Sequence, residues 1–201
     1  MDNVLTPEAR RWRTCVHEAG HAVAALLLGR AGIGAVVFDE GGGLATPTPE
    51  TDTPPRAADY TPEKLDPLYR SDDWKTLLLD ATFAAAGQAA VDLLLHPEKM
   101  ETSVNAADRA MMDAAARAAI GNYSDFYTEM HFNYMVGARA RCLLKPFLWR
   151  VERVAKALDK KSKLSADEVA AAMYPDHVRI AKDETKAETI NTTPEGSHAN
   201  V

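Results

Sequence analysis

The pentapeptide His17-Glu18-Ala19-Gly20-His21 has the residue types and spacing of a metal-dependent hydrolytic site. Side chains four residues apart lie on one face of an α-helix, so both imidazoles can reach a single metal ion. A zinc ion held by two imidazoles and one carboxylate keeps an open position, where a bound water has a pKa of about 7. Glu18 is then placed to take the water's proton and pass it to a leaving amine. The motif predicts zinc-peptidase chemistry; the alternative is that these residues merely share a helix.

The pentapeptide supplies only two ligands, so a third must come from elsewhere in the chain. A third histidine six residues after His21 is excluded, because Leu27 occupies that position. Cys15 is two residues before His17 and would face away from the metal on a helix. The later histidines are His96, His131, His177 and His198, and none of them lies in a recognisable ligand motif. A carboxylate is therefore the better candidate for the third ligand.

A helix is predicted from Thr6 to about Gly29, and it holds both histidines in one rigid element. Thr6 is a typical N-cap, Pro7 is favoured at the first helical position, and Glu8 complements the positive end of the helix dipole. The apolar residues that follow the motif indicate that this helix is buried.

Residues 33–39 (IGAVVFD) predict a short strand that is followed by a glycine turn. In zinc peptidases an extended substrate commonly adds to a sheet edge beside the metal. Val36, Val37 and Phe38 are therefore candidate substrate-binding residues. The alternative is a strand that only packs on the core.

Prolines and caps divide the rest of the chain into elements. The proline-rich segment 45–62 predicts an exposed loop, either a lid or an insertion without a role. Beyond this segment, the capping and helix-breaking residues of the chain predict further helices. An alanine-rich helix is expected over residues 74–96, packed against the metal helix, because small residues permit close approach. Further helices are expected over about 105–119, over 125–159 with a break at Pro146, and after a capping box at Ser165. Residues 179–201 lack periodicity and predict a disordered tail.

Composition limits the class of protein. The chain has 201 residues, of which 46% are hydrophobic and 26% charged, and alanine-rich sequence favours helices. A net charge of −6 argues against a nucleic-acid partner. The cluster Arg10, Arg11 and Arg13 is expected to be a solvated helix face.

Cys15 and Cys142 are far apart in the sequence, which favours reduced thiols and a cytoplasmic protein. The longest apolar run, residues 22–28, is too short to span a membrane.

Three segments resemble, in order and approximate spacing, the protease domain of FtsH-type ATP-dependent zinc metalloproteases, peptidase family M41. Residues 16–23 (VHEAGHAV) are similar to that family's metal helix. Residues 86–93 (AGQAAVDL) are similar to its glycine-arginine-alanine-glutamate helix. Residues 102–110 (TSVNAADRA) resemble its threonine-glycine-alanine-x-x-aspartate segment, whose aspartate is the third zinc ligand. Residues 155–169 also resemble its closing helices.

The resemblance implies an M41-like zinc peptidase domain over residues 1–178, mainly α with one short edge strand or a small β element. It implies that His17, His21 and Asp108 hold zinc, with Glu18 as the general base. The nearest competing carboxylate is Asp113, and Asp108 could alternatively be an exposed helix acid or a cap.

The sequence departs from the family pattern at Gln88 and Val91, which replace its arginine and glutamate. A buried ion pair at that place is therefore in doubt, although Asp92 could substitute in part. The chain also contains no Gly-x-x-x-x-Gly-Lys-Ser/Thr phosphate loop, so we expect a protease without its own ATPase motor.

The expected function is a zinc-dependent endopeptidase that hydrolyses peptide bonds in unfolded or flexible protein segments. Its expected partners are a protein or peptide substrate, a separate unfoldase or regulatory protein, and further copies in a homo-oligomer. The alternative is a non-catalytic M41-like zinc-binding protein that binds or regulates a partner protein. Glu18 opposes this alternative, because a structural zinc site has no use for a general base.

Overall fold

The structure, a computed structural model, describes residues 5–30, 33–38, 42–46, 74–97, 105–120 and 125–175. It is mainly helical with one small antiparallel sheet, as the sequence predicts. The elements in chain order are α1 (Pro7–Leu27), β1 (Gly34–Val37), β2 (Gly43–Thr46), α3 (Trp74–Leu95), α4 (Ala106–Ile120), α5 (Phe126–Leu144), the 3₁₀ turn η4 (Lys145–Phe147), α6 (Leu148–Lys161), β3 (Lys163–Leu164) and α7 (Ala166–Met173). The predicted tail 179–201 and most of the predicted loop 45–62 lie outside the described residues, although β2 includes residues 45 and 46.

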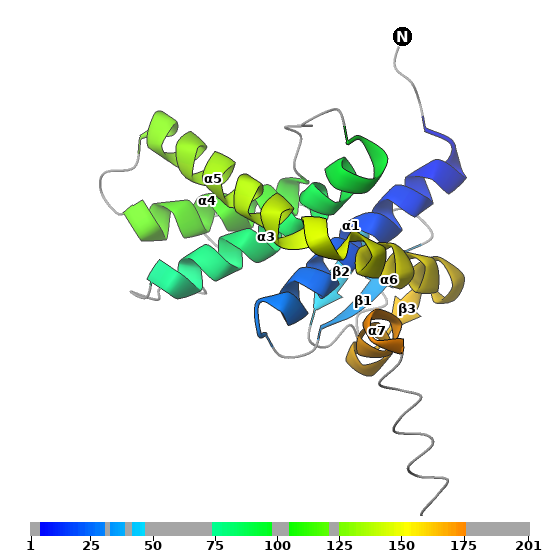
Figure 1. Cartoon of the computed structure of the whole chain (residues 1–201). Helices are drawn as coiled ribbons and strands as arrows, with labels where there is room; N and C mark the ends of the chain where they lie inside the picture. Colours follow the sequence, from blue (N-terminus) through cyan, green and yellow to red (C-terminus); the bar gives the residue numbers. More distant parts are fainter. Residues whose placement is uncertain are drawn as a thin grey trace, which may run out of the picture.

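Helix α1 is central, with α3, α4 and α5 on one side and α6, α7 and the sheet on the other (Figure 1). Its predicted start is confirmed, because the Thr6 hydroxyl accepts a hydrogen bond of 3.2 Å from the backbone N–H of Ala9. Residues 15–25 are all buried, and Gly29 follows the helix with a φ of +72°. The helix that carries the histidines is therefore the core of the fold.

Helix α3 packs against α1, as its small residues predict. A Cβ at Gly20 would lie 2.6 Å from the carbonyl oxygen of Ala86 and 2.6 Å from the Cβ of Ala90, so only glycine permits this approach. Among the described helices, α3 alone is long and apolar enough to cross a membrane, and 78% of its most apolar window is buried inside the protein. That burial is what a central core helix requires.

The sheet has the strand order β2-β1-β3, with both pairs antiparallel. The prediction of β1 is confirmed, but the interpretation of Val36, Val37 and Phe38 as a substrate-binding edge is wrong. Both sides of β1 are occupied, because Val36 is opposite Leu44 of β2 and Lys163 of β3. Among the described strands, the edge strand next to α1 is β2, which was not predicted from the sequence.

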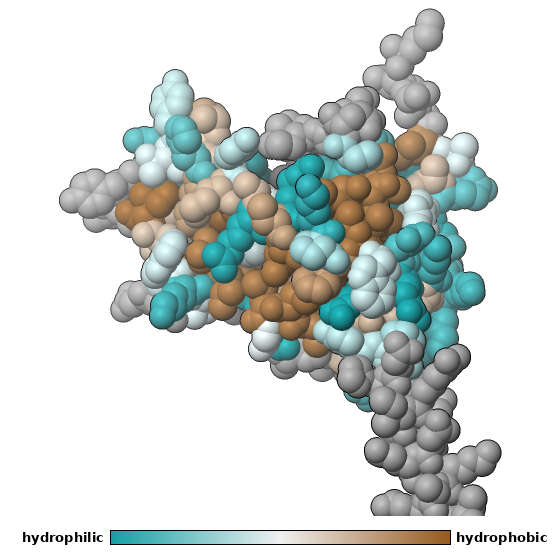
Figure 2. Space-filling view, viewed as in Figure 1, coloured by the Kyte–Doolittle hydropathy of each residue, from teal (hydrophilic) through white to brown (hydrophobic). Residues whose placement is uncertain are grey.

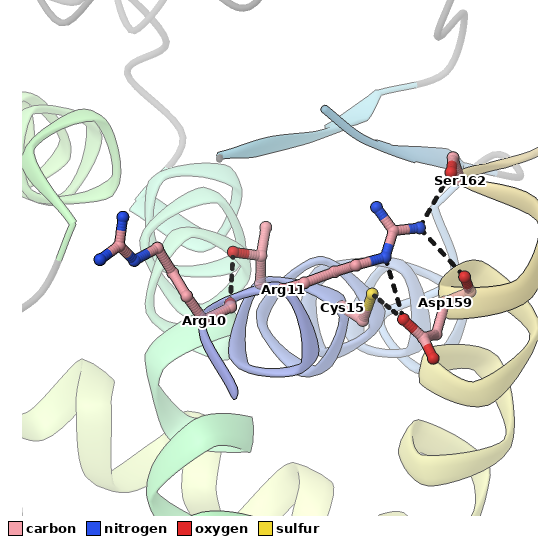
Figure 3. A network of polar contacts seen from close by, with 6 residues as sticks. Arg10, Arg11, Cys15, Asp159 and Ser162 are labelled. Atoms are coloured by element: carbon pink, nitrogen blue, oxygen red, sulfur yellow. Dashed lines mark hydrogen bonds and ion pairs between the residues drawn. The ribbon is translucent and has the colours of Figure 1, made fainter. Parts of the chain in front are cut away.

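Arg11 connects α1 to the end of α6 (Figure 3). Its guanidinium pairs with the Asp159 carboxylate at 3.1 Å and donates to the Asp159 carbonyl at 3.0 Å and the Ser162 hydroxyl at 2.9 Å. The Ser162 carbonyl accepts a hydrogen bond of 2.8 Å from the Val37 N–H of β1. The prediction of a solvated arginine cluster is therefore wrong for Arg11, which joins α1, α6 and the sheet.

The C-terminal elements begin and end where the proline and the capping box in the sequence predict. Pro146 lies in η4 between α5 and α6, at the predicted break. Ser165 and Glu168 form both hydrogen bonds of the predicted capping box at the start of α7.

In the space-filling view, hydrophobic residues form a broad area across the middle of the face shown, with hydrophilic residues between and around them (Figure 2).

Candidate metal centre

Three side chains from two helices converge on one point. His17 and His21 lie one turn apart on α1, and Asp108 lies in the first turn of α4. The two Nε2 atoms are 3.1 Å apart, and the Asp108 oxygens lie 2.9 Å from Nε2 of His17 and 3.3 Å from Nε2 of His21. Ligands about 2.0–2.1 Å from a tetrahedral zinc are separated by about 3.3 Å, so this spacing fits one metal ion.

The start of α4 determines where Asp108 points. The Asn105 side chain accepts a hydrogen bond of 2.9 Å from the Ala107 N–H, and its carbonyl accepts one of 2.8 Å from the Arg109 N–H. This cap fixes the first helical turn, in which Asp108 is buried. The competing carboxylate of Asp113 lies elsewhere on α4, where it accepts a hydrogen bond of 2.7 Å from Asn133.

Gly87 of α3 forms a cradle for the two imidazoles. A Cβ at this position would lie 2.4 Å from Nε2 of His21 and 2.6 Å from Nε2 of His17, so any side chain would displace the donor atoms. The close packing of α1 and α3 through Gly20 brings Gly87 to this position. The sequence signal was the alanine-rich stretch around Gly87, which predicted helix packing and not a role at the histidines.

The orientation of His21 is fixed by a backbone group. Its Nδ1 lies 2.8 Å from the Phe83 carbonyl oxygen, which can only accept a hydrogen bond. Nδ1 must therefore carry a proton, so in the neutral form that a metal ligand requires, the ring directs its Nε2 lone pair toward His17 and Asp108. A second contact that fixes the tautomer in this way is typical of metal-binding histidines.

Asp108 carries a buried oxygen that a cation would satisfy. Its Oδ2 is buried and accepts no well-directed hydrogen bond among the described residues. Burial raises the pKa of Asp108, but the neighbouring His21 and His17 lower it more. The pKa of this carboxyl therefore lies below its usual range. The site thus holds an ionised carboxylate with an unsatisfied oxygen beside two imidazoles, which fits a divalent cation.

Glu18 is buried beside these three groups. Burial raises its pKa, while the imidazoles of His17 and His21 partly oppose that rise. Gly43 of β2 packs directly on it, since a Cβ there would lie 2.4 Å from Cγ and 2.7 Å from Oε1 of Glu18. A carboxylate whose pKa is raised by burial is suited to act as a general base.

A scan against models of protein families found no match, and a search of curated proteins found no similar sequence. The arrangement of the side chains therefore carries the functional argument.

Other predicted features of the site can be placed. Cys15 is buried and faces α6, where its thiol lies 3.9 Å from the Asp159 carboxylate, and burial raises its pKa to about 11. It therefore faces away from the metal ligands, as predicted, and stays a thiol. Of the later histidines, His131 is exposed and contacts the Tyr127 carbonyl, and His177 and His198 lie outside the described residues.

Asp92 takes part in a partly buried ion pair close to Gln88 and Val91, the two positions that depart from the family pattern. One of its oxygens accepts a hydrogen bond of 2.7 Å from Gln88, and the other pairs with Arg141 of α5 at 3.1 Å. Val91 is fully buried. The charge pair exists, but its cation comes from α5, 49 residues along the chain.

Metal binding is expected to release a proton. Burial lowers the pKa of His21, but the Asp108 carboxylate raises it more, to about 9. At pH 7 the metal-free His21 is therefore protonated, and a metal must displace that proton. We expect release of about one proton per zinc at pH 7 and an affinity that rises as the pH rises toward 9. Calorimetry in two buffers of different ionisation enthalpy measures this; an affinity that is constant from pH 6 to 9 would contradict it.

Replacing Gly43 with alanine is expected to move Glu18. The new Cβ overlaps the Glu18 side chain, so peptide hydrolysis should fall about tenfold or more while zinc binding persists. Gly42→Ala is the control: Gly42 has a φ of +92° and open space around its Cβ, so this variant should lose stability without losing activity. Equal activity losses in the two variants would assign the effect to the turn and not to Glu18.

Proposed function

We propose that this protein is a zinc-dependent endopeptidase that cleaves unfolded or flexible protein segments. The observation that carries the proposal is the convergence of His17, His21 and Asp108 at metal-ligand spacing, with Glu18 buried beside them. A structural zinc site is normally closed by four protein ligands, whereas a catalytic one has three. His17, His21 and Asp108 are the one His/Cys/Asp/Glu group of this kind among the described residues.

The proposed reaction divides its work among the side chains. His17, His21 and Asp108 would hold the zinc ion, which would act as a Lewis acid and lower the pKa of a water molecule. Glu18 accepts the proton of the attacking water and later donates it to the leaving amide nitrogen. The Phe83 carbonyl keeps the His21 ring in place.

The candidate site for the substrate backbone is β2. It is an edge strand among the described strands, and its first residue, Gly43, contacts Glu18. An extended peptide that pairs with Gly43–Thr46 as a further strand would bring a peptide bond close to Glu18. Only a segment without its own secondary structure can pair in this way, which is why we propose unfolded or flexible substrates.

The family resemblance supports the same proposal. The three segments that resemble family M41 supply the two histidines, the helix that contacts them and the aspartate. We therefore propose an M41-like peptidase domain, with Asp108 in the place of the family's third ligand.

The test is hydrolysis of a fluorescently labelled, permanently unfolded protein and of a folded control, with the products identified by mass spectrometry. We expect cleavage of the unfolded protein alone, loss of cleavage with a zinc chelator, and recovery when zinc is returned. Stoichiometric zinc without cleavage would instead support the non-catalytic alternative. Cleavage that survives full removal of the metal would contradict the proposed function.

A further inference from the structure

A cavity of about 540 Å³ lies between α3, α4 and α5. His17, Glu18, His21 and Asp108 do not line it, so it is separate from the metal centre. Its volume is within the range of small-molecule sites, about 300–1,000 Å³. Such sites usually combine mainly apolar walls with a few polar groups, and this cavity has both.

The walls of the cavity are mainly apolar. Ala85, Ala89 and Leu93 come from α3, and Met112 comes from α4. Helix α5 adds methionine and small residues, of which Gly137 leaves open space within 4 Å of where its Cβ would be. Methionines adapt to the shape of an apolar ligand, and the missing side chain at Gly137 leaves room for one.

The charged groups at the cavity favour a single negative charge. Its ionic residues are Asp92, Arg109, Arg141 and Lys145. Asp92 pairs with Arg141 at 3.1 Å, and Arg109 pairs with Asp113 at 3.6 Å. Lys145 has no ion pair with another described residue. Among the described residues that line the cavity, one positive charge therefore remains, in a chain whose net charge is −6.

Arg141 and Lys145 are placed to bind one anion together. They are four residues apart at the end of α5, so they project from the same side. The Arg141 side chain makes one hydrogen bond within the described residues, to Asp92, and its other N–H groups are available to a ligand. A guanidinium beside an ammonium is a strong donor set for a carboxylate.

We propose that this cavity binds a small amphiphile with an apolar body and one carboxylate. The carboxylate lies between Arg141 and Lys145, and the apolar body lies over Gly137 and against Met112 and Leu93. The proposal is independent of the peptidase activity, because it concerns other residues and a binding event alone.

Decanoate, used below its micelle concentration, is the probe, and decanol and decyltrimethylammonium have the same chain with a neutral or positive head. We expect calorimetry on the full chain to show one decanoate per protein, bound at least about tenfold more tightly than either analogue. Failure of decanoate to bind, or equal affinity for all three compounds, would overturn the proposal. Equal affinity would indicate a nonspecific apolar surface.

Two variants assign the binding to this cavity. Gly137→Leu fills the space over α5 and should also favour the helix, and Lys145→Glu reverses the unpaired charge. Each is expected to weaken decanoate binding about tenfold or more. The matched controls are Arg139→Leu, exposed on α5 and outside the cavity, and Lys160→Glu, exposed on α6. Both controls should bind like wild type.

Unchanged affinity in Gly137→Leu would overturn the proposal, because its side chain must enter the space that the ligand needs. Thermal unfolding of each variant verifies the fold. If Gly137→Leu does not fold, Lys145→Glu decides the matter alone, because its side chain is exposed and has no core contact to lose. Loss of affinity in Lys160→Glu to the same extent would also overturn the proposal, since it would reveal a response to net charge only.

Discussion

Replacing Glu18 with glutamine is expected to lower hydrolysis of an unfolded protein by about 10²-fold or more, because a positioned general base typically contributes that much. Glutamine has nearly the same shape, so the contact with Gly43 and the packing of α1 should persist. It cannot accept the proton of the attacking water. Zinc content should not change, because Glu18 lies beside the three ligand side chains and is not one of them.

The control for this variant is Glu152→Gln, the same chemical change at a half-buried residue of α6 whose carboxylate pairs with Lys156. It should cleave at the wild-type rate. Cleavage and zinc content should be measured in the same samples, so that loss of metal is not mistaken for loss of the base. Wild-type hydrolysis by Glu18→Gln with its zinc in place would contradict the role assigned to Glu18.

The second large effect is expected at Asp108. In Asp108→Asn the site loses its negative charge and a ligand oxygen, while the Asn105 cap keeps α4 in place. Zinc affinity should fall by more than the 10–100-fold that is typical for groups outside the ligand set. Competition with a chromophoric chelator measures this, and hydrolysis should disappear at zinc concentrations that saturate the wild type.

Asp113→Asn is the matched control, since it changes another aspartate of the same helix. Asp113 contacts Asn133 and Arg109 and does not face the histidines. Its variant should bind zinc like wild type, with at most a loss of stability. If the two variants lose zinc equally, the effect belongs to α4 as a whole and Asp108 is not a ligand.

Local signals predicted the helices well. Thr6 and Pro7 fixed the start of α1, Pro146 the break before α6, and Ser165 the start of α7, because caps and prolines act within one helical turn. The strands β2 and β3 were missed because nothing in their short sequences favours a strand. They exist through pairing with β1.

The candidate site was predicted only in part, for the same physical reason. The spacing of His17 and His21 is local and can be read directly, whereas Asp108 is about 90 residues away and was suggested by the family resemblance. The contacts of Gly87 with the histidines and of Gly43 with Glu18 depend on how helices and strands pack. Local sequence does not encode such contacts, and a glycine has no side chain to indicate a role.

The most direct test of the metal centre is anomalous diffraction at the zinc absorption edge from crystals of the zinc-loaded protein. The account predicts one strong peak, about 2.0–2.2 Å from Nε2 of His17, Nε2 of His21 and an oxygen of Asp108. A peak at other residues, or none at this place in crystals that contain one zinc per chain, would contradict it.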